Sequence, residues 1–131
     1  MIQYGSDFML PAPLLTVKRA GAVRSRPRTE VPALIDTGSD VTAVPANLVR
    51  KLRLYRLRRI RIEDVEAREI AGHTYAIRLT VGDYPTREME VILTKLPFAV
   101  LGRDWLQEYY LLLNGPEQNF LLSQTPILEE L

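Results

Sequence analysis

The fold of this chain is decided by residues Val31 to Pro45, which read V-P-A-L-I-D-T-G-S-D-V-T-A-V-P. A nearly continuous apolar run comes first, and this pattern predicts a short strand that is buried on both faces. Asp36 follows directly, so its carboxylate stands where a rigid element ends. Thr37 and Ser39 supply hydroxyl groups, and Gly38 permits close approaches that a Cβ atom would prevent. The stretch therefore predicts a carboxylate held by a tight turn between two apolar segments.

An ordinary surface turn is the alternative explanation, because Asp, Thr and Gly are all common in turns. Such a turn does not require apolar residues on both sides, which this one has. The stretch resembles the active-site motif of the retropepsin-like family of aspartic proteases, apolar-apolar-Asp-Thr-Gly-Ser/Ala-x-x-Thr-x-apolar-Pro. The matching positions are Leu34, Ile35, Asp36, Thr37, Gly38, Ser39, Thr42, Val44 and Pro45.

A second match to the same family lies at residues 99–106, which read A-V-L-G-R-D-W-L. In the family this pattern forms a strand that crosses behind the catalytic turn and then opens a helix. Asp104 suits a helix start, and the apolar spacing predicts a helix that continues through Trp105, Leu106, Tyr109, Leu112 and Leu113. The resemblance implies that Arg103 pairs with Asp40, whereas the alternative is an arginine exposed to solvent.

Length and composition predict one domain, because 131 residues that are 47% hydrophobic can bury one core. Turn residues separate short apolar segments, which indicates an all-β domain with little helix. The resemblance implies a closed β-barrel or sandwich of the acid protease fold, with one or two short helices and one lobe per chain. Residues 1–131 are expected to be a single protease domain, in which residues 1–10 are an N-terminal extension or an interface strand.

The rest of the chain divides into short elements. We expect a first strand from Leu14 to Ala20 and then a polar loop from Gly21 to Glu30. A short helix is predicted over residues 46–52, strands over residues 75–81 and 88–94, and a hairpin with strands at 111–114 and 119–123.

The segment E-I-A-G-H-T-Y, residues 69–75, lies between predicted strands and resembles by position the flap, the mobile hairpin that closes over substrate. The resemblance implies that Ala71, Gly72 and His73 contact substrate. His73 is the only histidine of the chain, and a single histidine is more often an ordinary loop residue than a catalyst.

The segment from Arg50 to Arg61 is strongly basic, and it has two interpretations. It is either a patch for nucleic acid, an anionic surface or an acidic substrate, or a helix end followed by a strand with solvated arginines. The second interpretation is favoured because an acidic run follows directly and the net charge is only +1. It places five apolar side chains inward, namely Leu52, Leu54, Leu57, Ile60 and Ile62.

The resemblance also implies a mechanism. One Asp-Thr-Gly supplies half a site, so two copies of Asp36 from a homodimer would share a proton and activate water to cleave a peptide or protein substrate. Thr37 would join the two turns, and Gly38 would bind the substrate backbone, with Ser39 and Asp40 also near substrate. We expect Ser39 to donate to the charged Asp36 carboxylate, which favours an acidic optimum of about pH 4 to 6.

Composition excludes several other functions. With no cysteine and one histidine, neither a disulfide nor a metal site is expected, and the mechanism needs no cofactor. Neither a membrane-spanning run nor a signal peptide is found, so the default location is cytoplasmic and no membrane or nucleic-acid partner is expected. Two alternatives stay open: a catalytically idle retropepsin-fold domain for dimerisation or protein binding, and a nucleic-acid-binding β-domain that uses Arg50 to Arg61.

Overall fold

The computed structural model describes residues 1–6, 12–21, 29–63 and 66–127. Most of these residues lie in strands, and both helices in this part of the chain are short. The elements are β1 (Ile2–Gln3), β2 (Leu14–Gly21), β3 (Thr29–Ile35), β4 (Ala43–Pro45), α1 (Leu48–Leu52), β5 (Tyr55–Glu63), β6 (Glu69–Val81), β7 (Arg87–Thr94), β8 (Ala99–Leu101), α2 (Arg103–Leu106), β9 (Tyr110–Asn114) and β10 (Asn119–Ser123). The predicted all-β class is confirmed.

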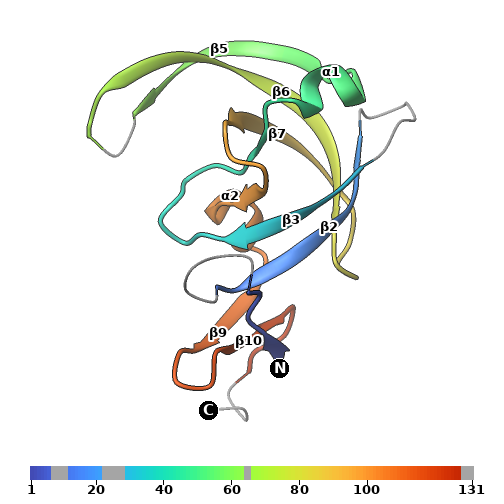
Figure 1. Ribbon diagram of the computed structural model, residues 1–131, viewed down its shortest axis with the longest axis vertical. Helices are drawn as coiled ribbons and strands as arrows, with labels where there is room; N and C mark the ends of the chain where they lie inside the picture. Colours follow the sequence, from blue (N-terminus) through green and yellow to red (C-terminus); the bar gives the residue numbers. More distant parts are fainter. Residues whose placement is uncertain (7–11, 22–28, 64–65, 128–131) are drawn as a thin grey trace.

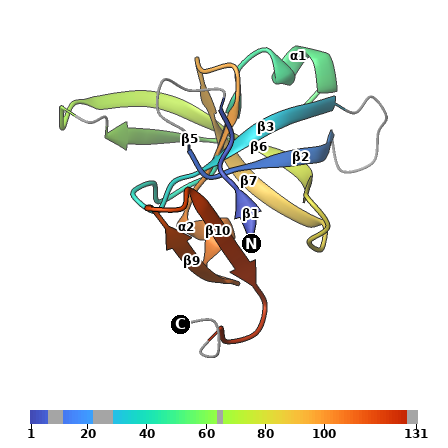
Figure 2. The ribbon, with the colours of Figure 1, turned by 60° about the horizontal axis from the view of Figure 1, so that its bottom comes forward.

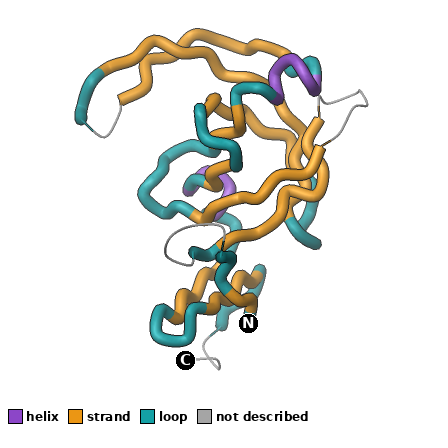
Figure 3. Tube along the Cα trace, viewed as in Figure 1, coloured by secondary structure: helices purple, strands orange, loops and turns teal. Residues whose placement is uncertain are grey.

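A seven-stranded sheet with the order β2-β3-β8-β4-β7-β6-β5 forms the body of the molecule. The end of the long strand β6 also pairs with β2, so the sheet curls round and closes on itself. Strand β5 pairs with the first half of β6 and projects with it as a hairpin. Figures 1 and 3 show these strands wrapped round a shared interior, as the resemblance implies for an acid protease barrel.

Two parallel strand pairs lie in the middle of this sheet. β3 runs parallel to β8, with Ile35 opposite Leu101, and β4 runs parallel to β7. Parallel neighbours need long connections, so segments far apart in the sequence end side by side. The two motifs of the sequence, after β3 and after β8, are thereby brought together.

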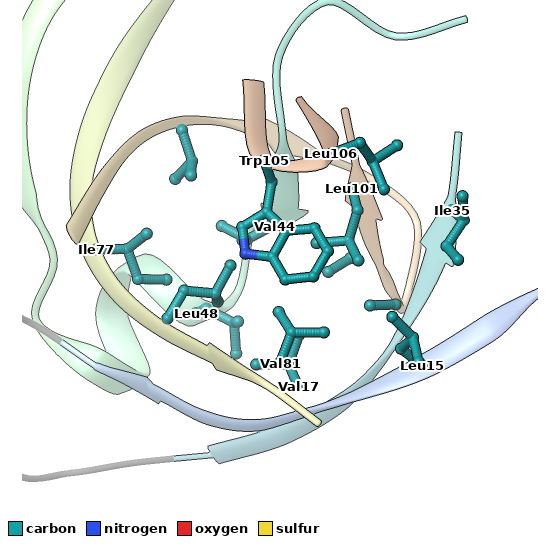
Figure 4. Packing of buried hydrophobic residues seen from close by; sticks show 14 of the residues in the cluster. Leu15, Val17, Ile35, Val44, Leu48, Ile77, Val81, Leu101, Trp105 and Leu106 are labelled. Carbon is teal, nitrogen blue, oxygen red and sulfur yellow. The ribbon is translucent and has the colours of Figure 1, made fainter. Parts of the chain in front are cut away.

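The core fills the interior of the barrel. Trp105 and Phe120 are its largest fully buried side chains. Along β6, four inward-facing residues alternate with more exposed ones, as the period of a half-buried strand requires: Tyr75, Ile77, Leu79 and Val81. Figure 4 shows Trp105 in the same cluster as side chains from β2, β3, β4 and β6. The core thus holds α2, which follows β8 directly, through the buried Trp105.

A three-stranded sheet, ordered β1-β10-β9, lies beside the barrel where the chain begins (Figures 1 and 2). The predicted hairpin is confirmed as β9 and β10. Ile2 of β1 lies opposite Phe120 of the same chain, whereas residues 7–11 fall outside the described part of the chain. The polar loop expected from Gly21 to Glu30 also lies mostly outside it, at residues 22–28, and β3 begins within its end.

The long helix predicted after Asp104 is wrong, because α2 ends at Leu106 and a strand begins at Tyr110. Leu112 and Leu113 therefore belong to β9. Three consecutive leucines fit either a helix or a strand, and here pairing with β10 decides for the strand. Tyr109 lies at the bend, where its ring stacks on Trp105 with centroids 4.6 Å apart.

In the basic segment, the interpretation as a helix end followed by a strand is confirmed by α1 and β5. Leu52 and Leu54 are buried as expected, but Leu57 is 51% exposed. The register of β5 against β6 shifts between Arg56 and Arg59, so the residues that follow the shift point to the face opposite to the one that simple alternation gives them. Leu57 lies within this irregularity, and the prediction that it points inward is wrong. Ile60 and Ile62 lie opposite Gly72 and Ile70, on the side of β6 away from the buried Tyr75, so the prediction is wrong for them as well.

The segment proposed as the flap is not a loop between strands. Residues 69–75 form the first half of β6, and Gly72 lies opposite Ile60 of β5. The hairpin turns earlier, between β5 and β6, in a segment that includes residues 64–65 outside the described part. A single glycine, here between Ala71 and His73, is compatible with strand pairing, which explains why the pattern misled.

Candidate active site

The candidate catalytic residue Asp36 is the first residue after β3, as the sequence predicts. Its backbone N–H donates to the carbonyl of Leu101 at 3.0 Å, which continues the β3–β8 pairing up to the carboxylate. Its own carbonyl accepts the N–H of Ser39 at 3.2 Å and closes the turn. The half-buried Asp36 side chain is thus carried by a backbone that is fixed on both sides.

Gly38 forms a close contact with this carboxylate. Its backbone N–H donates to Oδ1 of Asp36 at 2.9 Å. A Cβ atom at position 38 would lie 3.2 Å from the same oxygen, which is tighter than most Cβ contacts in proteins. A residue without a side chain therefore suits this position, and one Asp36 oxygen keeps a fixed orientation.

The turn rests on the segment that follows β8. The N–H of Arg103 donates to the carbonyl of Ser39 at 2.8 Å, and the N–H of Asp104 to that of Asp40 at 3.3 Å. Gly102 comes so close that a Cβ atom there would lie 2.6 Å from the backbone carbon of Val41. The 36–42 loop, defined as residues 36 to 42, is therefore held against residues 101–104 through its main chain.

The predicted ion pair between Arg103 and Asp40 is confirmed. The same guanidinium donates through Nη1 to the carbonyl of Thr37 at 2.9 Å. Both side chains of the pair are more than half exposed, so the pair adds little to global stability. Its effect is local, because one arginine fixes two points of the 36–42 loop.

Ser39 does not bond to Asp36. Its hydroxyl donates to the carbonyl of Val41 at 2.7 Å, so its single proton is used within the loop. The expectation that Ser39 donates to the Asp36 carboxylate and thereby tunes the pH optimum is wrong. The side-chain hydroxyl of Thr37, by contrast, is exposed and has no hydrogen-bond partner among the described residues.

Thr42 and Asp104 form a buried network that sequence reasoning missed. Thr42 is fully buried, and its Oγ1 donates to Oδ1 of Asp104 at 2.7 Å while accepting the N–H of Gly102 at 3.1 Å. The backbone N–H of Thr42 donates to the other Asp104 oxygen at 3.0 Å. Thr42 of the first motif and Asp104 of the second therefore bind each other. The signal that could have revealed this contact is that each residue is part of one of the two family motifs.

Replacing Thr42 with Val should destabilise the protein by about 1–3 kcal/mol, because the isosteric side chain leaves the buried Gly102 N–H without a partner and removes one of the two donors to Asp104 Oδ1, the other being the Trp105 N–H. Urea unfolding measures this loss. Thr42→Ser keeps the hydroxyl and loses one buried methyl, worth about 1 kcal/mol, so it serves as the control. A Val variant as stable as the Ser variant would contradict the role of the hydroxyl.

Arg87 is a second residue that the sequence did not reveal. From β7 it donates to the backbone carbonyls of Trp105 and Asp104, at 2.8 and 2.9 Å. These carbonyls belong to α2, which is too short to satisfy them within the helix. Arg87 therefore fastens α2, and with it the second motif, to the barrel.

The remaining predicted site residues, Ala71, Gly72 and His73, lie on the β5–β6 hairpin. In Figures 1 and 2 this hairpin projects on the same side of the molecule as the 36–42 loop, although it belongs to a different part of the sheet. It is braced by Arg58, which donates to both Glu90 oxygens at 2.6 and 3.1 Å.

Glu90 lies on β7 and also accepts the hydroxyl proton of Thr74. The hydrogen bond from Arg58 is the main cause that lowers the pKa of Glu90 below its usual value, with the Thr74 hydroxyl second. The same bond raises the pKa of Arg58. The hairpin base is thus connected to β7 by a charged pair.

Comparison with known proteins extends this picture. The sequence model of a family described as "gag-polyprotein putative aspartyl protease" matches residues 27–108, which is more than half of the chain and contains both motifs. The chain belongs to the retropepsin-like aspartic protease family. No curated protein sequence matches this family member.

Among solved structures, the foamy viral protease-reverse transcriptase in complex with an RNA/DNA hybrid resembles this retropepsin-like chain with a TM-score of 0.57 at 17% identity. The match covers 74% of this chain and only 12% of the foamy viral chain. EIAV protease in complex with the inhibitor HBY-793 gives a TM-score of 0.44 at 24% identity, covering 65% of this chain and 88% of that one. The foamy viral match supports the retropepsin fold.

Two further properties of the retropepsin-like domain concern its described residues. No group of three or more His, Asp or Glu side chains in this part of the chain could hold a metal ion. Over the same residues, none of the helices has the length and apolar character needed to cross a membrane.

Proposed function

We propose that this protein is an aspartic endopeptidase whose active site forms between two copies of the chain. The observation that carries the proposal is the intact Asp36-Thr37-Gly38 turn, with its carboxylate oriented by the Gly38 N–H, in a chain of this family. Residues 1–131 supply one lobe with one such turn, so a second lobe is required for two carboxylates. The substrate class is a peptide or protein chain.

In the proposed dimer, the two Asp36 carboxylates face each other across a two-fold axis. Two like charges at hydrogen-bond distance cannot both ionise easily, so the pair holds one proton. The ionised carboxylate takes a proton from a water molecule, which attacks the peptide carbonyl, while the protonated one donates to the carbonyl oxygen. Collapse of the tetrahedral intermediate returns a proton to the leaving amine and breaks the C–N bond.

The other loop residues have supporting roles in this proposal. The exposed Thr37 hydroxyl, which is unpartnered among the described residues, is available to bond to the partner's turn. Gly38 leaves room for the substrate backbone beside Asp36. Arg103 and Asp104 position the 36–42 loop through hydrogen bonds to Thr37 and Thr42, and in this proposal they do not contact substrate. Asp40, Ser39 and the hairpin contribute to the surroundings of the substrate.

Specific activity should fall when the protein is diluted below the dimer dissociation constant, because a monomer holds only half of the proposed site. Peptide cleavage measured over a range of protein concentrations, together with sedimentation, tests this. A monomer whose specific activity does not change with concentration would contradict the shared site.

Mixing subunits provides the control for this prediction. An excess of Asp36→Asn chains should suppress the activity of a fixed amount of wild-type protein, because most wild-type chains then lie in heterodimers with one carboxylate. Excess Glu117→Gln chains, altered at an exposed turn between β9 and β10, should instead raise the total activity, because their homodimers and their heterodimers with wild-type chains all keep two Asp36 carboxylates. The catalytically idle alternative predicts no cleavage of any peptide in a library screened from acidic to neutral pH.

A further inference from the structure

We propose that the concave face of the β5–β6 hairpin, through Arg56 and Arg59, selects peptides that carry acidic side chains on the segments flanking the scissile bond. This inference rests on the proposed function and names its substrate class. It gives the basic segment a role in substrate selection, which the proposed chemistry at the 36–42 loop does not explain.

Strand register shows which residues share this face. Antiparallel partners point to the same side of a sheet, and β5 pairs Arg56 with Tyr75 and Arg59 with His73. Tyr75 is buried in the core, so this side of β6 faces the interior of the barrel. Where the hairpin projects beyond the core, the same side becomes its concave face, which carries Arg59 and His73.

The opposite face differs in chemistry. It carries Ile62, whose Cδ1 would lie 2.8 Å from a Cβ atom on Gly72, together with the partly exposed Ile60 and Ile70. The Arg58 guanidinium also lies there, engaged with Glu90. From residue 58 to 62 and from 70 to 74, the convex face is therefore apolar apart from a neutralised pair, whereas the unpaired basic charge of the hairpin lies on the concave face.

On the concave face, the arginines without an acidic partner lie at the end of the hairpin that joins the barrel. Arg61 pairs with Glu69 near the end of the hairpin, and Glu63 lies on the same side. Arg56 and Arg59 are exposed, and neither has an ion pair or hydrogen bond with another residue in the described part of the chain. Two adjacent cations without acidic partners mark a place for carboxylates of another molecule.

The position of this face links it to catalysis. The hairpin arches on the side of the molecule where the 36–42 loop projects, as both ribbon views show. An acidic side chain directly beside Asp36 would be repelled by the catalytic carboxylates. The arginine nearest to this loop, Arg103, is already paired with Asp40 and does not offset that repulsion. The preference therefore applies to residues away from the scissile bond, on the segments that pass under the hairpin.

Binding to the full-length Asp36→Asn protein tests the inference without cleavage. The probes are two fluorescent peptides of the same apolar central sequence, flanked by Glu in one and Gln in the other. Fluorescence anisotropy should show about tenfold tighter binding of the Glu peptide, which is the size of one charge-assisted hydrogen bond. The preference should shrink as salt is raised.

Arg59→Gln and Arg56→Gln should each reduce the preference for the Glu peptide over the Gln peptide. The double variant should bind the two peptides almost equally. Arg78→Gln is the matched control, because Arg78 is an exposed arginine on the convex side of β6, where its backbone lies opposite Glu88 of β7. Equal binding of both peptides, an unchanged preference in the double variant, or an equal loss in the control would overturn the inference.

Cleavage by the wild-type protein separates this inference from the proposed function. If the Glu preference in binding depends on Arg59 but no peptide is cleaved, the acidic selectivity stands and the protease assignment fails. If Glu and Gln peptides are cleaved with equal kcat/KM, the protease assignment stands and the selectivity fails. Displacement of the Glu peptide by a single-stranded oligonucleotide at far lower concentration would overturn the choice of a peptide partner.

Discussion

Replacing Asp36 with Asn is expected to lower kcat/KM for peptide cleavage by about 10³-fold or more, because a step that depends on general acid–base catalysis loses both groups at once. The fold should survive. The Asn side chain has the same shape, and its Oδ1 can still accept the Gly38 N–H that now lies 2.9 Å from the aspartate. The loss should therefore be one of chemistry rather than of structure.

Purified wild-type and variant proteins compared at equal dimer concentration give the measurement, with urea unfolding as the check on folding. Glu117→Gln removes a carboxylate from the turn between β9 and β10 and should keep full activity. Asp36→Asn protein that retains substantial cleavage after chromatography would refute the assignment of Asp36. A variant that unfolds early would instead show that this carboxylate is structural.

The second large effect is expected from Gly102→Ala. A methyl group at this position would lie 2.6 Å from the backbone carbon of Val41, 2.7 Å from its oxygen and 3.0 Å from the oxygen of Ser39. These are main-chain atoms of the 36–42 loop and cannot rotate away. The backbone of Gly102 itself has φ −87°, which any residue can adopt, so the cost comes from the collision.

The loop must therefore move, and a displacement of about 1 Å at a catalytic group costs about 10²-fold in rate. Overpacking should also lower the free energy of unfolding by about 1–3 kcal/mol. Gly115→Ala is the matched control, because nothing lies within 4 Å of the Cβ position there, and it should be neutral in both assays. Equal behaviour of the two variants would contradict the close packing of the loop on residues 101–104.

The location of the candidate site could be predicted from the sequence, because its signals are local. A buried strand that ends at Asp36, with glycine two residues later, needs only the apolar pattern and a turn. The pairing of Arg103 with Asp40 came from the two motifs of one family. These are short segments in which the residues themselves restrict the backbone to few conformations.

Features that depend on contacts between distant segments were harder to predict. The three leucines of β9 fit both periodicities, so the sequence predicted both a helix through Leu113 and a strand at 111–114, and pairing with β10 decides for the strand. Ile60 and Ile62 lie on the outer face because of a register shift that no single-strand pattern reveals. The sequence places Ser39 three residues after Asp36 but does not say where its hydroxyl points, and in the folded loop it donates to the Val41 carbonyl. The role of Thr42 required knowing that Asp104 lies beside it.

The Thr42–Asp104 network joins residues 62 positions apart in the chain. The parallel pairing of β3 with β8 spans a similar distance, so these contacts form only after a long loop has closed. Folding dominated by such non-local contacts is slow, in the range of about milliseconds to seconds for small β-domains. The carboxylate turn thus depends on chain far downstream, and a nascent chain that lacks residues beyond β7 holds Asp36 without the segment that orients it.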